Sequence, residues 1–441
     1  MSEDSRAAPV CHQQAVQGYL ATSSGLPAVE LLVPFQERVY ICDDTQLHGG
    51  ADMRQEPIRH WSRKGSRPLL LVATSVASLL VAACGSSSGG GTSSSSSSSS
   101  SGGAAVPTGK IALLLPETQT TRYEAFDKPY FYDKLKALGY DTGNILYSNA
   151  NQNASTQVSQ VEAAITNGAK VLVLDPVDSK AAAALADKAK ANGIPVVSYD
   201  RLILNSSGVS YYVEYDSLTV GKLQGQALVD ALTKAGKTNP TIVEINGDPA
   251  DNNAKLFKQG AHSVFDPLVS SGKLTIAKEY DTPNWTPANA QNEMQQALTA
   301  LGNKVDGVYA ANDGTAGGAY AAMKTAGLNP IPPLTGQDAE LAAIQRIVAD
   351  QQTITIYKPI RPLADAAAQA AFALAGGNKP DSSVFATKVN NNTADVPTDQ
   401  INVVAVTKAN IKDTVIKDGF YTAAQICTAD YAAACTAAGV Q

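Results

Sequence analysis

From residue 109 onward, short runs of apolar residues alternate with longer stretches in which apolar residues recur at helical spacing. The apolar runs are KIALLL (110–115), NILYS (144–148), KVLVLD (170–175), IPVVSYD (194–200), TIVEING (241–247), LTIAKEY (274–280), VDGVYAAND (305–313) and TITIYK (353–358). Because these runs are continuous rather than alternating, they predict parallel strands covered by helices on both faces. Roughly ten strands over about 330 residues favour an α/β fold of two lobes, each with a doubly wound parallel sheet. A single barrel of eight βα units is the alternative.

A separate apolar segment, PLLLVATSVASLLVAA (68–83), ends at Cys84. It is shorter than the roughly 20 residues that a membrane-spanning helix needs. Five basic residues precede it: Arg54, Arg59, Arg63, Lys64 and Arg67. The small residues before Cys84 resemble the lipobox of bacterial lipoprotein signals, which implies a signal peptide over 53–83 and lipidation of Cys84. A plain transmembrane helix is the alternative.

Two further segments fall outside the predicted fold. Residues 1–52 precede the expected signal start at Met53, and we interpret them as a non-native or disordered extension in which Cys11 and Cys42 have no obvious partners. Residues 84–107 are almost entirely Gly, Ser, Thr and Ala. Because such a segment buries almost no apolar area, it predicts a flexible tether between the lipid and the folded body.

The charge and the cysteine and histidine content indicate which partners and which cross-links to expect. The formal net charge is −6, and no run of Lys and Arg follows the signal, which argues against a nucleic-acid partner. In an exported protein, Cys427 and Cys435 predict a local disulfide, with two free thiols as the alternative. His262 is the single histidine of the mature body, and we interpret it as a surface or packing residue in a protein without a metal or cofactor.

Polar residues collect directly after the predicted strands, where parallel α/β sheets bind their ligands. These residues are Arg122, Tyr123, Tyr199, Asp200, Arg201, Asp251, Asn252, Asn253, Asn284, Trp285, Asn312, Asp313, Gly336, Gln337, Asp338 and Lys358. An Asn or Asp at such a position often only caps the next helix, and Trp285 has a core position as its alternative. Together, however, they offer carboxylates, amides, cations and an aromatic face, which is the chemistry that sugar hydroxyls and a sugar ring require.

Seven segments carry a resemblance to a known family: SYDR (198–201), DNNAKLF (251–257), NWTPANA (284–290), ANDGTAGGA (311–319), GQDAE (336–340), TIYKP (355–359) and IKDTVIKDGF (411–420). In order and spacing they resemble the periplasmic sugar-binding proteins of ABC importers with the ribose-binding-like (type I) fold, most closely the xylose-binding branch. The resemblance implies two lobes that are joined by three crossovers and close over one sugar. The expected N-terminal lobe comprises 108–214 plus 358–396, and the C-terminal lobe 215–357 plus 397–441.

Carried over by position, the resemblance implies that the sugar contacts are Arg122, Asp200, Arg201, Asn253, Trp285, Asn312, Asp338 and Lys358. The first loop, PETQTT, departs from the family pattern because Tyr123 follows Arg122 where a tryptophan is expected. The implied protein is a monomer, lipid-anchored at the outer face of the plasma membrane. It binds a monosaccharide, D-xylose first, and delivers it to an ABC permease and its ATPase.

Two other functions stay open from the sequence. A sugar-sensing module for a membrane receptor would have the same lobes. A glycoside hydrolase would use Asp200 and Asp338 as its carboxylate pair. The sequence contains no Walker loop, dinucleotide-binding glycine motif or nucleophile elbow, so we expect no enzyme and assign no catalytic residue.

Overall fold

The computed structural model describes residues 11–14, 39–42 and 106–440. The first two segments are an antiparallel pair of strands, β1 (Cys11–Gln14) and β2 (Val39–Cys42), in which Cys11 stands opposite Cys42. The hydrophobic pattern did not predict this pair. The predicted signal peptide, Cys84 and the tether as far as residue 105 lie outside the described residues. Within the described residues, no helix has both the length and the apolarity that a membrane crossing requires.

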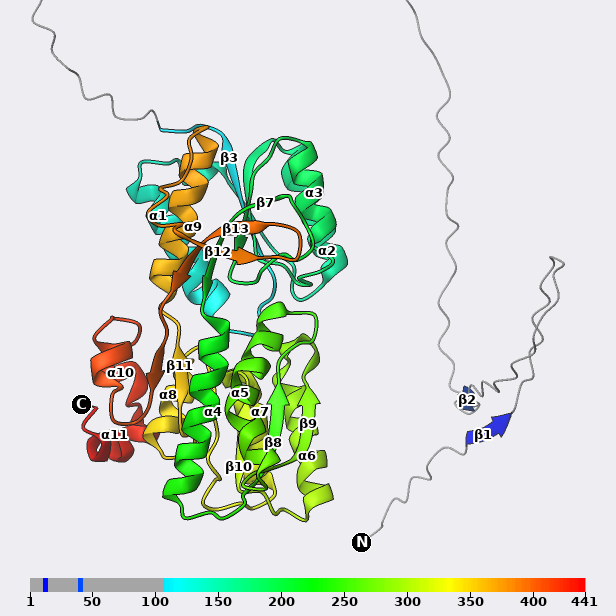
Figure 1. Ribbon diagram of the computed structural model, residues 1–441, viewed down its shortest axis with the longest axis vertical. Coiled ribbons are helices and arrows are strands. Elements are labelled where there is room, and N and C mark those ends of the chain that lie inside the picture. The colour runs from blue at the N-terminus through cyan, green and yellow to red at the C-terminus, as the bar shows by residue number, and fades with distance from the viewer. Residues whose placement is uncertain (1–10, 15–38, 43–105, 441) are drawn as a thin grey trace, which may run out of the picture. The chain divides into compact units, whose positions relative to one another are not determined.

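Residues 106–440 fold into two α/β lobes (Figure 1). The first lobe has one sheet of seven strands in the order β12-β13-β7-β6-β5-β3-β4. Its strands are β3 (Lys110–Leu115), β4 (Ile145–Asn149), β5 (Ala169–Leu174), β6 (Val196–Tyr199), β7 (Val209–Tyr215), β12 (Thr387–Asn390) and β13 (Asp395–Ile401). Neighbouring strands are parallel except for β12 and β13, which pair antiparallel at one edge.

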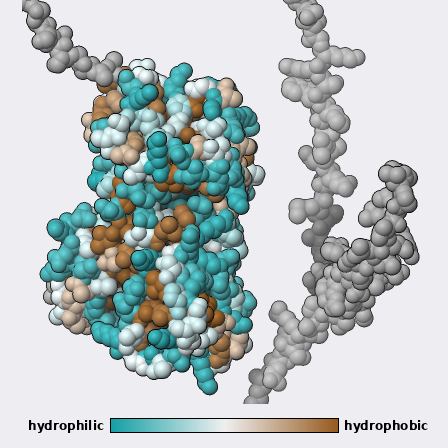
Figure 2. All heavy atoms as spheres, in the orientation of Figure 1, coloured by the Kyte–Doolittle hydropathy of each residue, from teal (hydrophilic) through white to brown (hydrophobic). Residues whose placement is uncertain are grey.

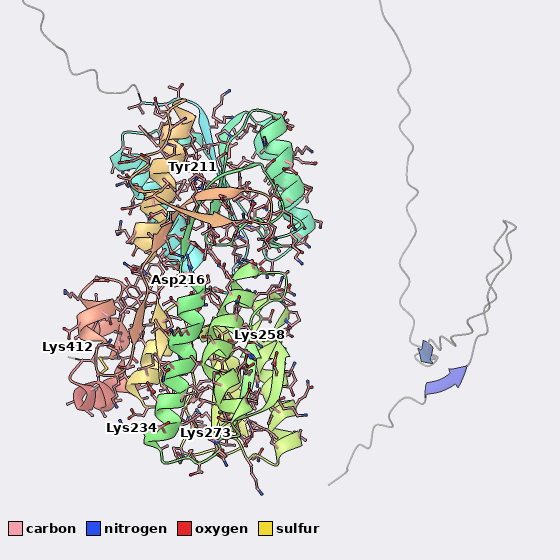
Figure 3. All side chains as sticks on the ribbon, viewed as in Figure 1. Tyr211, Asp216, Lys234, Lys258, Lys273 and Lys412 are labelled. Carbon is pink, nitrogen blue, oxygen red and sulfur yellow. A yellow bond between two sulfur atoms is a disulfide. The ribbon has the colours of Figure 1, made fainter. Side chains whose placement is uncertain are left out.

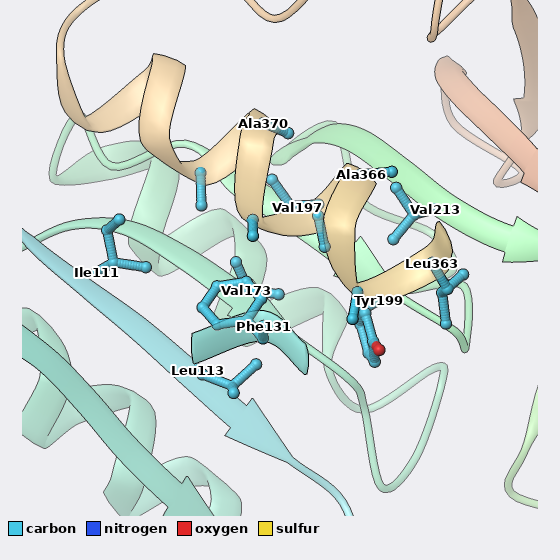
Figure 4. Close-up of a cluster of buried hydrophobic side chains, with 14 of the residues drawn as sticks. Ile111, Leu113, Phe131, Val173, Val197, Tyr199, Val213, Leu363, Ala366 and Ala370 are labelled. Atoms are coloured by element: carbon cyan, nitrogen blue, oxygen red, sulfur yellow. The ribbon is translucent and has the colours of Figure 1, made fainter. Parts of the chain in front are cut away.

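Helices cover both faces of this sheet, as the continuous apolar strands predicted. On one face lie α1 (Lys128–Ala137) and α9 (Ile360–Ala375), and on the other α2 (Ala154–Thr166) and α3 (Ala183–Ala191). Under α9, the buried side chains of Leu113, Val173 and Val197 meet Ala366 and Ala370, whose small size lets the helix lie close to the sheet (Figure 4). Burying each larger side chain contributes roughly 2 kcal/mol, so this cluster is a main source of the stability of the lobe.

The second lobe is built around the parallel strands β8 (Thr241–Asn246), β9 (Thr275–Asp281) and β10 (Gly307–Ala310), in the order β10-β8-β9. Next to β10, the segment that contains Leu334 and Gln337 forms two isolated bridges, one from Leu334 to Val308 of β10 and one from Gln337 to Ile356. Ile356 belongs to β11 (Thr355–Tyr357), which pairs antiparallel with β14 (Val404–Val406). One face packs against α4 (Ser217–Lys234) and α5 (Asn252–Ser270), the other against α6 (Pro287–Leu301) and α7 (Asp313–Thr325).

The two helices on the first of these faces pack unusually close together. Gly221 of α4 lies against the backbone of α5, because a Cβ built there would stand 1.8 Å from the carbonyl oxygen of Phe257. Both helices begin at an aspartate, and for Asp251 this agrees with the helix-cap interpretation of a strand-end residue. Asp216 caps α4 and Asp251 caps α5, each through its side chain, and Asp216 marks the start of α4 in Figure 3.

The chain crosses between the lobes three times. The crossings lie between β7 and α4, between β11 and α9, and between β13 and β14. The prediction of two lobes is confirmed, and the eight-unit barrel is wrong because the strands form separate open sheets. The third crossing was expected between 396 and 397, but β13 stays paired with β7 as far as Ile401, so the chain leaves the first lobe only after that residue.

The C-terminal segment packs on α8 (Leu341–Val348) of the second lobe (Figure 1). It contains α10 (Ala423–Ile426) and α11 (Ala432–Ala438), which a disulfide between Cys427 and Cys435 ties together. Short single-turn helices complete the fold: η1 (Tyr123–Asp127), η2 (Thr142–Asn144), η3 (Pro283–Trp285), η4 (Lys412–Ile416) and η5 (Ala429–Tyr431). Figure 2 shows one face of the two lobes, on which hydrophilic residues dominate and hydrophobic residues form scattered groups.

Candidate functional site

One cavity between the lobes brings together all eight residues that the resemblance implied. Its empty volume, including space open to solvent, is about 300 Å³. The lining residues are Thr120, Arg122, Tyr123, Asp200, Arg201, Asp251, Asn253, Phe257, Trp285, Asn312, Gln337, Asp338 and Lys358. Of these, Thr120 and Phe257 were not singled out in the sequence. Phe257 follows Asn253 by one helical turn of α5, so helical spacing was the signal that could have found it.

Arg122 is fixed in place by a carboxylate behind it. Its Nε and Nη2 donate to the two oxygens of Asp127 at 2.9 and 2.7 Å, and Tyr199 also donates to Asp127. The third nitrogen, Nη1, lies 2.7 Å from Oδ2 of Asp200. Two parallel hydrogen bonds to one carboxylate fix the orientation of the guanidinium group, and they leave Nη1 turned toward the cavity.

Asp200 is held in a conformation that few residues adopt. Directly after β6 its φ is +54°, and its carbonyl oxygen accepts from Tyr212 and from Nδ2 of Asn253. Burial alone would raise the pKa of its carboxyl, but the positive charges of Arg122, Lys358 and Arg201 outweigh burial and hold that pKa below its ordinary value. Asp200 is therefore an ionised acceptor.

Arg201 is surrounded by carboxylates from both lobes. Its Nε lies 3.1 Å from Asp251 of the second lobe and 3.6 Å from Asp175 of the first, and its Nη2 lies 3.8 Å from Glu117. Burial opposes the charge of the guanidinium, but Asp251 and the other carboxylates raise the pKa of Arg201 above its ordinary value. The pair of Arg201 and Asp251 thus links the lobes at the cavity.

Trp285 is both a core residue and a cavity residue. The indole is buried, packs edge-on against Phe257 with ring centres 6.4 Å apart, and donates from Nε1 to Asp251 at 3.2 Å. Gly247 makes room for the ring, because a Cβ there would lie 1.9 Å from it. The two interpretations of this tryptophan in the sequence were therefore not exclusive.

The helix-cap interpretation of Asn312 likewise agrees with its place in the cavity. Its Oδ1 accepts from the backbone N–H of Thr315 and caps α7, and the residue also lines the cavity.

Lys358 lies beside a carboxylate at the wall of the cavity. Its Nζ is 2.8 Å from Oδ1 of Asp338 and lies over the rings of Tyr215 and Phe257. The cation and the carboxylate hold each other at the wall of the cavity.

Several buried polar atoms of the cavity have no hydrogen-bond partner among the described residues. They are Nη1 of Arg122, Oδ1 of Asn253, Oε1 of Gln337 and Oδ1 of Asp338, the first and last of which have only a charged neighbour at ion-pair distance. Buried polar groups are nearly always hydrogen-bonded, and leaving one unpaired, as at Asn253 and Gln337 here, costs about 1–3 kcal/mol. The arrangement fits a small ligand with several hydroxyl groups.

The lobes also touch around the rim of the cavity. On one side, Ser179 donates from its backbone N–H to the carbonyl of Ala250 at 3.1 Å, and Gln152 donates to Asp248 at 2.8 Å. On the other side, the backbone N–H of Thr121 donates to Glu340 at 3.2 Å. The structure is therefore a closed form in which the lobes shut off the cavity.

Asp200 is poorly suited to act as the acid of a hydrolase. A general acid needs a carboxyl group that keeps its proton near neutral pH, whereas the cations beside Asp200 hold its pKa below the ordinary value. Asp338 faces Lys358 and Asp251 faces Arg201, so each cavity carboxylate lies beside a cation. This arrangement suits binding of a polar ligand.

The profile of one protein family, described as a periplasmic binding protein domain, matches residues 111–379. The chain belongs to this family. As a periplasmic binding protein, it is 40% identical over 312 residues to the D-xylose-binding periplasmic protein of Escherichia coli, an alignment that covers 71% of this chain and 91% of that protein. The family resemblance seen in the sequence is thereby confirmed.

Two further comparisons place this periplasmic binding protein among carbohydrate binders. It is 35% identical to the multiple sugar-binding periplasmic receptor of Rhizobium radiobacter, over 73% of this chain and 93% of that one. A carbohydrate transporter solute-binding protein of Chloroflexus aurantiacus, solved with D-glucose, superposes with a TM-score of 0.66 at 33% identity and covers 71% of this chain and 97% of its own. The predicted fold is confirmed.

Proposed function

We propose that this periplasmic binding protein is the extracytoplasmic solute-binding subunit of an ABC sugar importer and that its ligand is a monosaccharide, D-xylose first. The observation that carries the proposal is the cavity between the closed lobes, in which carboxylates, two guanidinium groups, a lysine and amides meet an aromatic face. The 40% identity to a D-xylose-binding periplasmic protein supports the choice of sugar.

Each group has a role that its chemistry suggests. The carboxylates of Asp200 and Asp338 accept hydrogen bonds from sugar hydroxyls, while Arg122 and Lys358 donate to hydroxyl or ring oxygens. Asn253 and Gln337 have buried carbonyl oxygens for further hydroxyl donors. The rings of Trp285 and Phe257 cover the apolar C–H face of the sugar. Because the contacts come from both lobes, the sugar binds the closed form more tightly than an open one and shifts the population toward it.

The cellular role follows from the tether. A lipid at Cys84 holds the protein at the outer face of the plasma membrane, and the segment 84–107 lets the monomeric body reach the permease. The permease recognises the paired lobe surfaces, and its ATPase subunit supplies the energy. A permease and an importer ATPase encoded beside this gene support transport, whereas a receptor gene alone supports the sensing alternative.

The test is calorimetric titration of the full chain with D-xylose, followed by D-glucose, D-ribose, L-arabinose and D-galactose. We expect one site per chain and the tightest binding for D-xylose. The fluorescence of a Trp61→Phe variant, which leaves Trp285 as the only tryptophan, changes at the same sugar concentrations. Lack of binding to every monosaccharide overturns the proposal, and tighter binding of another sugar overturns the choice of D-xylose.

A matched pair of variants assigns the binding to the cavity. Asp338→Asn loses a charged acceptor and should weaken binding about 10- to 100-fold. Asp413→Asn, the same change at an exposed position, should bind as the wild type does. Release of nitrophenol from nitrophenyl β-D-xyloside by the wild type, lost in Asp200→Asn, would instead establish the hydrolase.

A further inference from the structure

Two glutamates face each other on neighbouring strands, away from the sugar cavity. Glu244 of β8 and Glu279 of β9 are register partners in a parallel pair, so both side chains project from the same face of the sheet. Glu244 is fully buried, whereas Glu279 is exposed on β9, the strand at the edge of this sheet. Like charges directly opposite each other destabilise a sheet, and a cation between them removes the repulsion.

A histidine from α5 completes the cluster. Nε2 of His262 lies 3.1 Å from Oε2 of Glu244, and its Nδ1 lies 2.8 Å from Oδ1 of Asp266 on the next turn. One potential ligand atom from each of Glu244, His262 and Glu279 lies within 4.8 Å of the other two. An imidazole that binds a metal through one nitrogen usually has a carboxylate or carbonyl at the other, which is the place of Asp266 here.

The neighbouring cations leave one buried oxygen without a partner. Lys258, one turn before His262 and labelled in Figure 3, contacts Glu279 at the edge of the cluster. Oε1 of Glu244 has no hydrogen bond from any described residue, although the side chain is completely buried. An unpaired carboxylate oxygen at that depth costs free energy unless it has a charged partner.

We propose that Glu244, His262 and Glu279 form a binding site for a divalent metal ion of the zinc class. One imidazole nitrogen and two carboxylate oxygens are a ligand set that zinc accepts, with water at the fourth position. Calcium and magnesium prefer oxygen ligands throughout, so the histidine favours zinc over both. The ion takes the place of the ammonium group of Lys258, a partly exposed side chain that turns into solvent.

Such an ion would join β8, β9 and α5. Of the residues that line the cavity, Asn253 belongs to α5, Asp251 caps that helix, and Trp285 belongs to η3, which follows β9. The site shares none of the residues that line the cavity, so the proposal of a metal site does not depend on whether the cavity binds a sugar. Its expected effect is on the stability of the second lobe, because an ion that binds only the folded state raises the unfolding temperature.

The experiment is calorimetric titration of the chelator-treated full chain with ZnCl₂, together with thermal unfolding with and without the metal. The chain has other histidines and cysteines before residue 106, so the readout is the difference between variants. We expect His262→Gln and Glu279→Gln to weaken this zinc site about tenfold or more and to lose the zinc-induced rise in unfolding temperature.

Lysine variants separate a metal site from a plain ion-pair network. Lys258→Met removes the competing cation and should tighten zinc binding about two- to fivefold, the worth of an exposed ion pair. Lys278→Met is the matched control, because Lys278 precedes Glu279 on β9 and points to the opposite face. Zinc binding that is unchanged in His262→Gln and Glu279→Gln overturns the proposal. So does weaker binding in Lys258→Met, because the lysine then supports the cluster instead of competing for it.

Discussion

At the scale of single residues, the charged groups of the cavity depend on partners that do not line it. Asp127 is the clearest case, since it takes both inner nitrogens of Arg122 and a hydroxyl from Tyr199. Asp127→Asn keeps the size of the side chain but lets the guanidinium turn. We expect a loss of sugar affinity of about 10- to 100-fold with an unchanged fold, measured by calorimetry and circular dichroism.

A control distinguishes positioning from general damage. Tyr199→Phe removes only a hydroxyl from the same carboxylate and leaves the fork on Arg122 intact, so it should cost less affinity than Asp127→Asn. Equal losses in the two variants would mean that Asp127 does not act through Arg122.

Glu214, at the end of β7, makes stability depend on pH. Burial raises the pKa of its carboxyl to about 7, although a hydrogen bond from the amide of Gln400 opposes the shift. The folded protein then holds a proton that the unfolded chain has released, so this contribution to stability is complete below about pH 4.5 and is lost as the pH rises through 7.

The variant Glu214→Gln removes that titration. Between pH 5 and pH 8, its free energy of unfolding should fall less than that of the wild type. The difference is on the order of 3 kcal/mol at most, and the unfolding temperature falls less accordingly. Thermal unfolding at both pH values measures it. Glu162→Gln, at an exposed position, should keep the pH profile of the wild type, and a parallel profile for Glu214→Gln would contradict the prediction.

At the scale of elements, the close packing of α4 against α5 tests how the second lobe is held together. Gly221→Ala puts a methyl group 1.8 Å from the carbonyl of Phe257, so the helices must move apart. Gly225→Ala, one turn further on, meets its nearest atom at 3.2 Å. Both changes gain the same helix propensity, so Gly221→Ala should be less stable than Gly225→Ala by about 1–3 kcal/mol in urea unfolding.

The elements also show where sequence reasoning reaches its limit. Ligands of parallel α/β sheets bind at the carboxyl ends of the strands, and this rule predicted Arg122, Asp200 and Asn312 as cavity residues. It succeeds because the loop that follows a strand in a βα unit always lies at that end of the sheet. It did not find Phe257, since an apolar residue inside a helix has the periodicity of a core position. The pairing of Glu244 with Glu279 was equally hidden, because register between strands far apart in sequence is set by packing of the whole lobe.

The position of β13, the strand before the third crossing between the lobes, was also not predictable from the hydrophobic pattern. β13 carries Thr398, Asp399 and Gln400 next to β7, and its polar composition gives no strand signal. It is a strand because its backbone completes the sheet, a tertiary effect that composition does not encode. The third crossing therefore came later than predicted.

At the scale of the whole molecule, affinity depends on closure as well as on contacts with the sugar. The rim bond from Gln152 to Asp248 exists only when the lobes are shut, and neither residue lines the cavity. Removing it lowers the population of the closed form, and the apparent dissociation constant rises by the same factor for every ligand. Gln152→Ala should therefore weaken D-xylose and D-glucose binding equally, by about two- to tenfold for one lost hydrogen bond.

A cavity variant behaves differently, and the comparison decides between the two mechanisms. Asp338→Asn changes a contact that differs between sugars, so the ratio of the two affinities should shift. Calorimetry of the wild type and both variants with both sugars gives one affinity ratio for each protein. If Gln152→Ala also changes the ratio, the rim contact acts on the pocket itself. An unchanged affinity in Gln152→Ala would instead mean that closure does not depend on this side of the rim.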